Sequence, residues 1–365
     1  MKIKINDYIF NRNTSNLIII IIIISMTILM LTSTLEILFY PDIAYSYTFN
    51  ITNKLKQQQR QNSYQTNISQ PSIITTNNQK KSSDDLNNNL TKVVILTFGD
   101  GYQSQFTLAK PVLDKYGYKG NFFVTCNKVG TANKMTWPDL VQLYKEGNVI
   151  GSKTVDYGTK AMGGKDLNHL SAQQLEFEVG QSKQCLLNHG INTTFFAVPM
   201  NVANNNATVI NEIAKYYTLA INGHADQMYL HCDGYKKNSS QTDCRTYFDN
   251  GTLTFANRYS VGEWSEQHIK NRNSYNDSQM FAKFIAAVNS QDKFNRNGVS
   301  AIPLIAYHDI VLLPDITISS EPSATTLNLF KTEMKYLHDN GFNVLTFYNL
   351  GYNEKTNAFY IKQNQ

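Results

Sequence analysis

The chain has 365 residues, of which 42% are hydrophobic and 17% charged, and a formal net charge of +5. About +3 of this charge lies before residue 91 and about +2 after it. The larger part therefore lacks the strongly basic face of nucleic-acid-binding proteins, and we expect no nucleic-acid partner. That part, roughly 275 residues, has the size of a single α/β barrel domain. Its many aromatic residues suit either a carbohydrate-binding surface or an aromatic-rich core.

The N-terminal segment is predicted to attach the chain to a membrane. Three basic residues within residues 1–16 precede an uncharged apolar stretch, Leu17–Leu35. Its length is close to the minimum for a membrane-spanning helix, and the basic flank predicts a cytoplasmic N-terminus with the rest of the chain outside. We therefore expect a transmembrane anchor or signal sequence over residues 17–40. The triplet Ala44-Tyr45-Ser46 resembles a signal-peptide cleavage site. A cleaved signal peptide is therefore the alternative, and it would give a secreted protein.

Two regions follow this segment. Residues 41–90 are rich in Asn, Gln and Ser with few apolar residues, a composition that predicts a disordered linker. Residues 91–365 alternate short apolar strands with amphipathic helices, so we expect one folded domain there. The predicted strands are 93–96, 121–124, 149–150, 194–198, 219–221, 302–306 and 344–347. The predicted helices are 104–116, one capped by Thr136, one from a cap at Ser171 to about 187, and helices around 207–216, 278–289 and 324–340.

This alternation predicts a parallel sheet, for which a barrel is the usual closed form. Functional residues of such barrels follow the carboxyl ends of the strands. Asp100 follows the first strand. It is either a functional residue, as a ligand or a general base, or a structural residue that closes the strand in an Asx-turn. Lys153 follows the third strand, where a solvated surface lysine is the ordinary interpretation. His308 and Asp309 follow a late strand, where a carboxylate could orient a histidine that acts as a general acid.

The four cysteines lie at positions 126, 185, 232 and 244. Cys232 and Cys244 close a short polar loop, so a disulfide is the favoured interpretation. A zinc site with His231 is the alternative, although the spacing fits no standard zinc motif. Cys126 and Cys185 occur in apolar surroundings and are expected to be buried free thiols.

In chain order, the motifs that follow the strands resemble those of the polysaccharide deacetylase family, the NodB-homology domain, over most of residues 92–350. The family's Thr-Phe-Asp-Asp-Gly is TFGDG here, and its Gly-His-Glu-Ile-Gly-Ser-His-Thr-x-x-His is GNVIGSKTVDY. The stretch FFAVPMN corresponds to its Arg-x-Pro-Tyr element, and IAYHDI to its late Leu-x-His-Asp. AINGHADQMY stands where the family has a strand-end Asp-Trp pair. The resemblance implies a distorted (β/α) barrel of the polysaccharide deacetylase type.

The resemblance also implies roles for individual residues. In the family a divalent metal, commonly zinc, is held by the second Asp and two histidines, and the first Asp is the general base. Asp100 would be the only retained ligand position, and His308 would be the acid that protonates the leaving amine. The replaced positions are Gly99 for the base, Lys153 and Tyr157 for the two histidines, and Ala197 for the Arg that orients the base.

These replacements predict that the metal site is lost or altered. A lysine ammonium has no lone pair to offer a cation, and near Asp100 it would itself supply the positive charge of the metal (hypothesis). Asp156 and His169 are weaker candidates to rescue the site. Two functions remain open at this point. One is a hydrolase that removes N-acetyl groups from surface polysaccharides. The other is a catalytically inactive, membrane-tethered glycan-binding or structural protein.

Overall fold

The computed structural model describes most of the region predicted to fold. The described residues are 92–156, 166–201, 206–224, 227–230, 258–266, 269–270, 273–296, 298–312, 323–355 and 358–362. The predicted anchor, the predicted linker, Tyr157 and the Cys232–Cys244 loop lie outside these ranges. Within them, no helix is long and apolar enough to cross a membrane.

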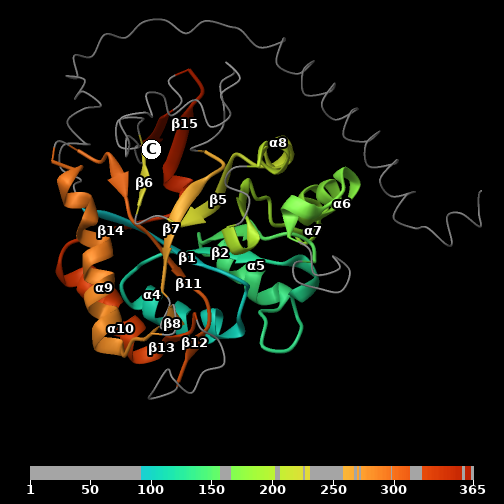
Figure 1. Cartoon of the computed structure of the whole chain (residues 1–365). Coiled ribbons are helices and arrows are strands. Elements are labelled where there is room, and N and C mark those ends of the chain that lie inside the picture. The colour runs from blue at the N-terminus through green and yellow to red at the C-terminus, as the bar shows by residue number, and fades with distance from the viewer. Residues whose placement is uncertain are drawn as a thin grey trace, which may run out of the picture. The chain divides into compact units, whose positions relative to one another are not determined.

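Seven parallel strands form a closed barrel at the centre of the domain (Figure 1). Each strand is hydrogen-bonded to the next around the ring, and the last pairs with β1 to close it. In ring order the strands are β1 (Val93–Phe98), β2 (Asn121–Val124), β3 (Val149–Ser152), β4 (Phe195–Ala197), β5 (Leu219–His224), β7 (Val261–Ser265) and β11 (Leu304–Tyr307). The predicted (β/α) barrel is therefore confirmed.

The barrel differs from the predicted strand set at two points. β7 was not predicted, although it closes the ring between β5 and β11. Two of its inward positions are the polar Glu263 and Ser265, so its sequence shows no continuous apolar run. The predicted last strand is observed as β14 (Asn343–Leu345), which pairs only with β1 and lies outside the ring.

Alternate residues of the barrel strands face opposite sides, as the two-residue period of a strand requires. On β1, Val93 and Ile95 belong to the core cluster inside the barrel, whereas Val94, Leu96 and Phe98 pack against the surrounding helices. The same alternation on the other strands directs one side chain in two toward the barrel axis. At the carboxyl ends of the strands these inward residues form the candidate site.

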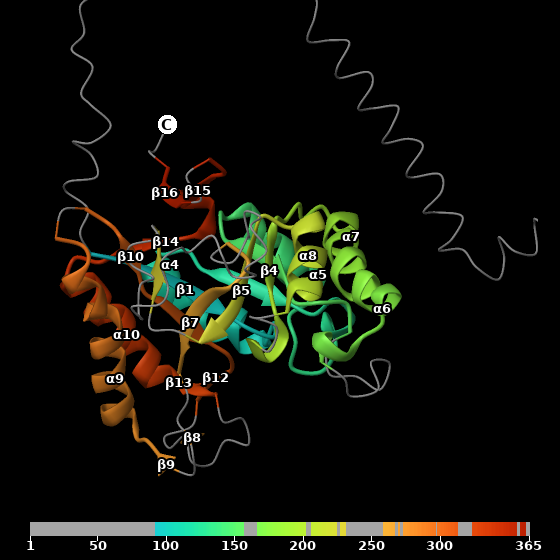
Figure 2. The same cartoon turned by 45° about the horizontal axis from the view of Figure 1, so that its top comes forward.

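Helices surround the barrel on its outer side (Figure 2). They are α4 (Lys110–Lys115), which continues a π-helical turn, η1 (Gln105–Ala109), then α5 (Trp137–Lys145), α6 (Ala172–Glu176), α7 (Ser182–Asn188), α8 (Ala207–Tyr216), α9 (Asp277–Asn289) and α10 (Leu327–Asp339). The two predicted caps are confirmed. The side chain of Thr136 accepts a hydrogen bond from the Asp139 amide, and that of Ser171 accepts one from the Gln174 amide.

Shorter elements complete the described part. A second π-helical turn, η5 (Phe177–Gln181), joins α6 to α7. The two-stranded sheets pair β6 (Met228–Tyr229) with β10 (Ala301–Ile302), β8 (Ile269–Lys270) with β9 (Asn273–Ser274), β12 (Ile310–Val311) with β13 (Thr325–Thr326), and β15 (Leu350–Asn353) with β16 (Ala358–Ile361). The 3₁₀ turns are η2 (Cys126–Lys128), η4 (Leu167–His169), η6 (Pro199–Asn201), η8 (Ser290–Lys293) and η10 (Phe347–Asn349).

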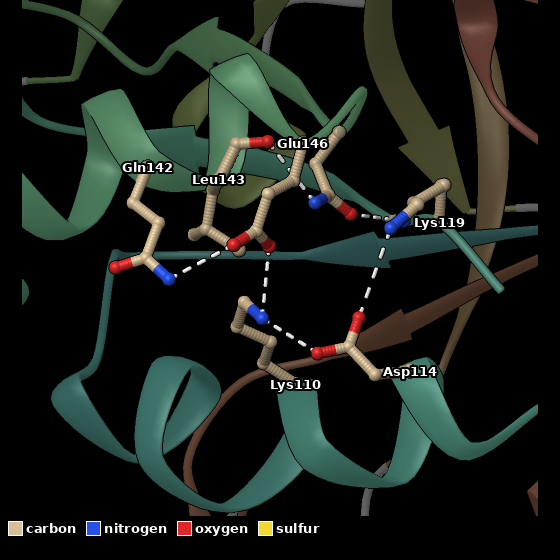
Figure 3. Close-up of polar contacts among 8 residues, drawn as sticks. Lys110, Asp114, Lys119, Gln142, Leu143 and Glu146 are labelled. Carbon is tan, nitrogen blue, oxygen red and sulfur yellow. Dashed lines mark hydrogen bonds and ion pairs between the residues drawn. The ribbon is translucent and has the colours of Figure 1, made fainter. Parts of the chain in front are cut away.

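A network of charged side chains joins α4 to the end of α5 on the outside of the barrel (Figure 3). Lys110 Nζ lies 2.5 Å from Asp114 Oδ2 and 2.8 Å from Glu146 Oε2. Gln142 donates to the other oxygen of Glu146 at 2.9 Å. Exposed ion pairs each contribute little to stability. The apolar contacts of the two helices with the core therefore contribute more to their docking than this network does.

The prediction for Cys126 and Cys185 is wrong. These residues form a disulfide, with their Cα atoms 6.4 Å apart. Cys126 begins the turn after β2, and Cys185 lies on α7, which packs beside that turn. Both residues are half-buried. The apolar sequence around each cysteine indicated burial, but it held no information on the contact between segments 59 residues apart.

Candidate functional site

A cavity of about 290 Å³ opens at the carboxyl ends of the barrel strands. This is close to the lower end of the roughly 300–1,000 Å³ typical of ligand pockets. Its lining combines polar and charged residues with an apolar part, as a site for a small amphipathic ligand requires. The lining residues are Thr97, Gly99, Asp100, Phe123, Lys153, Ala197, Val198, Met200, Ile221, Glu263, Ser265, Ala306, His308 and Ser323.

Asp100 lies in the turn that leaves β1, where its backbone is left-handed, with φ of 68°. Lys153 follows β3 directly, and its Nζ lies 2.6 Å from Asp100 Oδ1. The Lys153 side chain is only 10% exposed and that of Asp100 26%. The hypothesis that Lys153 supplies a positive charge beside Asp100 is therefore supported by a direct ion pair. The interpretation of Lys153 as a solvated surface residue is wrong.

His308 engages the other oxygen of Asp100. Its Nδ1 lies 2.8 Å from Oδ2. Burial by itself raises the pKa of Asp100, but the Lys153 ammonium and the hydrogen bond with His308 outweigh it and hold the pKa well below its usual range. An ionised carboxylate can only accept hydrogen bonds, so Nδ1 of His308 carries a hydrogen and donates a hydrogen bond to Asp100. Asp100 thus joins two nitrogen-bearing side chains.

Gly99 leaves room for this arrangement. A Cβ atom at position 99 would lie 3.0 Å from both Cε1 and Nδ1 of His308 and 3.5 Å from Lys153 Nζ. The space in which a side chain at position 99 would begin is therefore largely occupied by the histidine ring. Ala197 also lines the cavity, with a methyl group in place of a long polar side chain. The positions assigned by resemblance to the base and to its Arg partner thus provide neither a carboxylate nor a guanidinium.

The described residues do not fit the divalent metal that the resemblance implies. Both oxygens of Asp100 are already engaged, one by an ammonium that repels cations and the other by a ring N–H. Across the ranges that the structure describes, no group of three or more His, Cys, Asp or Glu side chains is placed to hold a metal ion. Structural and catalytic zinc sites use at least three protein ligands.

The remaining predicted residues do not meet at the cavity. Asp309 Oδ1 accepts a hydrogen bond of 2.6 Å from Ser104, whose hydroxyl also accepts from the Ile310 amide. His169 pairs with Asp166 at 2.7 Å and is 70% exposed. Asp156 is buried, and its amide donates to the carboxylate of Glu178. None of Asp309, His169 and Asp156 lines the cavity.

Sequence analysis missed one charged lining residue. Glu263 lines the cavity from β7, and its Oε2 accepts a hydrogen bond of 2.9 Å from the hydroxyl of Thr97 on β1. The small side chain of Ala306, on the intervening strand β11, also lines the cavity. A signal was present in the sequence, because Glu263-Trp264 is an acidic residue followed by tryptophan, as in the pair expected at a strand end.

Backbone strain is concentrated at this end of the barrel. Four described residues other than glycine have a positive φ, namely Asp100 (68°), Asn133 (61°), Thr154 (73°) and Met200 (56°). Asp100 and Met200 line the cavity, and Thr154 directly follows Lys153. Such conformations cost about 1–3 kcal/mol each and cluster at ligand-binding and catalytic sites. The strain therefore favours the cavity as the functional site.

The strand-end segment that carries Lys153 is held by its neighbours. The hydroxyl of Thr125 donates to the Lys153 carbonyl oxygen at 2.9 Å, and the Cys126 amide donates to the Thr154 carbonyl oxygen at 3.1 Å. The Glu178 carboxylate accepts hydrogen bonds from the next two amides of the segment. The disulfide of Cys126 thus fixes the turn that borders the Lys153 segment.

Comparisons with known proteins agree with the motifs. Residues 87–220 match the family described as polysaccharide deacetylase. Over 93 residues the chain is 33% identical to a putative polysaccharide deacetylase, YxkH, of Bacillus subtilis (strain 168). That alignment covers 26% of this chain and 31% of the relative, so the chain matches about a third of the relative's length.

Several solved structures are also similar. The deacetylase PplD of Streptococcus pyogenes, in complex with acetate, is 26% identical, with 37% of this chain and 58% of that chain covered and a TM-score of 0.34. The Xyl-CE4 domain of a xylanase from the hindgut metagenome of Trinervitermes trinervoides is 18% identical, with 74% and 95% covered and a TM-score of 0.44. The barrel itself is established by the order of its strands. The family match covers residues 87–220, which include β1 to β4, so this part of the chain is similar to the polysaccharide deacetylase family.

Proposed function

We propose that the chain is an exported, membrane-anchored protein that binds surface glycans in the barrel cavity without a catalytic metal. One observation carries this proposal, namely the ion pair of 2.6 Å between Lys153 Nζ and Asp100 Oδ1. It places an ammonium group beside the one ligand position that the resemblance retains. The positive charge at the site then belongs to the protein itself.

The surroundings of the ion pair favour a binding role. The cavity retains strained backbone at Asp100 and Met200, which a site without any ligand would have no need to keep. Apolar side chains of Phe123 and Ile221 line the same space as the polar Thr97. A sugar unit also presents both apolar C–H faces and polar hydroxyl groups, so this lining suits it.

A hydrolase is the second candidate, and the position of His308 favours it. His308 lines the cavity with its side chain 20% exposed, as a residue that protonates a leaving group would. Against this, Gly99 cannot accept a proton, and loss of a general base costs roughly a hundred- to ten-thousand-fold in rate. Loss of the metal would remove water activation and oxyanion stabilisation as well. We therefore rank glycan binding first.

Export is supported by two features. The apolar stretch within residues 17–40, with its basic N-terminal flank, is typical of an anchor or signal sequence. The disulfide between Cys126 and Cys185 agrees with an oxidising compartment, because structural disulfides are rare in reducing cytosol. Residues 1–16 would then lie in the cytoplasm and the barrel outside.

The test uses the full-length chain in detergent. Binding of chitin and chitosan oligosaccharides is measured by calorimetry with added zinc and with a chelator, and acetate release is assayed in the same samples. The proposal predicts binding that is equal with zinc and with chelator, and no acetate above the protein-free control. Acetate release that requires zinc would favour the hydrolase, and absence of any oligosaccharide binding would refute the glycan-binding role.

A further inference from the structure

We propose that Glu263 makes the cavity selective for a protonated amino sugar, the deacetylated form of a hexosamine, over its N-acetylated form. This inference rests on the proposed glycan-binding function and specifies its ligand. It arises from the charges that line the cavity and from their places around the barrel.

Lys153 and Glu263 occupy opposite walls. Lys153 follows β3 and Glu263 lies on β7, and β4 and β5 separate these strands along the shorter path around the ring. Lys153 Nζ is 2.6 Å from Asp100, and His308 donates to the same carboxylate. The positive charge at the β3 side is therefore compensated within the protein.

Glu263 has no such compensation. Within the described part of the chain, its hydrogen bond comes from the neutral hydroxyl of Thr97, which is 2% exposed and engages Oε2. No ion pair joins Glu263 to a cation of that part. Glu263 is itself half-buried and lines the cavity. A partly buried carboxylate without a cation is unfavourable, and a ligand that brings a positive charge would relieve this.

A second polar group on the same strand also lacks a partner. The hydroxyl oxygen of Ser265 is buried and has no hydrogen-bond partner among the described residues, although Ser265 lines the cavity. Buried polar atoms are usually hydrogen-bonded in native proteins. Glu263 and Ser265 are two positions apart and so face the same side of β7. Both residues therefore belong to the same wall of the cavity.

An ammonium group fits this wall better than a metal ion does. Glu263 is the one carboxylate at this wall of the described cavity, whereas a metal needs several ligands. A primary ammonium donates up to three hydrogen bonds and forms strong charge-assisted bonds to a carboxylate. The N-acetylated sugar carries no charge and presents a bulkier amide, so it would leave the Glu263 charge uncompensated. The amine of a deacetylated hexosamine supplies the missing cation.

The experiment compares two ligands of equal length on the full-length chain. A glucosamine tetramer and the same tetramer after chemical N-acetylation are titrated by calorimetry at a mildly acidic pH, where the sugar amines are protonated. We expect the amine form to bind on the order of tenfold more tightly. Glu263→Gln should abolish this preference. Glu354→Gln is the matched control, because Glu354 is 66% exposed and pairs with Arg258 away from the cavity.

Each outcome bears on a different claim. Preference for the amine form that Glu263→Gln removes and Glu354→Gln retains would support the inference. Equal or tighter binding of the acetylated tetramer by the unmodified chain would overturn it, while glycan binding would stand. Absence of binding by either tetramer would overturn the proposed function as well. An amine preference that Glu263→Gln retains would also overturn the inference. The ligand comparison needs no variant, so it can overturn the inference even if Glu263→Gln fails to fold.

Discussion

Nζ of Lys153 lies 2.6 Å from Oδ1 of Asp100, so an ammonium group sits beside the carboxylate at the position that the family resemblance assigns to a metal ligand. The second oxygen of Asp100 accepts a hydrogen bond from His308 at 2.8 Å. The three side chains come from the ends of β1, β3 and β11. They form a site in which the charge of the lysine is balanced within the protein.

Removal of the ammonium should destabilise the fold. In Lys153→Met, His308 remains as the partner of the Asp100 carboxylate within the group of Asp100, Lys153 and His308. Breaking a buried ion pair costs up to about 3–5 kcal/mol in stability. Because the Asp100 side chain is 26% exposed, we expect a smaller loss, about 1–3 kcal/mol in the free energy of unfolding. Urea denaturation of the two proteins measures it. Lys335→Met, which breaks an exposed pair with Asp339 on α10, should have no measurable effect.

A metal site should be recoverable by substitution. Gly99→Asp, Lys153→His and Tyr157→His together restore the residues that the family pattern expects, and we predict that the triple variant binds zinc with a stoichiometry of about one. Gly99→Asp alone should weaken the fold, because the new Cβ would lie 3.0 Å from the His308 ring. Equilibrium dialysis against zinc checks the first point. A triple variant that folds and binds no metal would show that the second motif is wrongly aligned.

The disulfide should contribute substantially to stability. It closes a loop of 59 residues, for which the loss of unfolded-chain entropy corresponds to about 4 kcal/mol. Cys126→Ala with Cys185→Ala is therefore expected to lower the melting temperature strongly. Calorimetry of both proteins, with and without reductant, makes the measurement. Reductant should destabilise the unmodified chain more than the double variant. Equal melting temperatures for the two oxidised proteins would contradict the prediction.

A buried acidic residue outside the site gives a pH dependence. Glu333 on α10 is fully buried and accepts a hydrogen bond of 2.9 Å from Tyr307. Burial, and then the neighbouring Glu266, raise the pKa of Glu333 well above its usual value. The folded state therefore keeps a proton that the unfolded state releases, and the contribution of Glu333 to stability is complete in acid and declines as the pH rises.

Glu333→Gln should reduce this decline, because the amide is neutral at every pH. The free energy of unfolding is measured from mildly acidic to mildly alkaline pH for both proteins, with the exposed Glu354→Gln as the control. The variant should gain relative stability as the pH rises. The same pH slope in Glu333→Gln and in the unmodified chain would show that Glu333 does not carry this effect.

Much of the fold was predictable from local sequence. The helix starts at Thr136 and Ser171 were predicted from capping residues, and six of the seven barrel strands from short apolar runs. β7 was missed because its inward side chains include Glu263 and Ser265. A strand that supplies polar groups to a cavity loses the apolar pattern by which a buried strand is found.

The candidate site was predictable only in part. Asp100, Lys153 and His308 were identified by their order after strands, and their convergence follows from the parallel barrel. Glu263 was missed because its strand, β7, shows no continuous apolar run, although the pair Glu263-Trp264 was visible in the sequence. His308 and Asp309 do not act together as the sequence suggested. Asp309 accepts a hydrogen bond from Ser104 and does not line the cavity, whereas His308 does.

The most direct test of the account is a zinc titration of the full-length chain and of its Asp100→Asn variant, with the bound metal measured after dialysis. We predict that the two proteins bind the same amount of zinc, because Lys153 already pairs with the Asp100 carboxylate. One equivalent of zinc on the unmodified chain that is lost in Asp100→Asn would contradict the account, and would show that Asp100 still serves as a metal ligand.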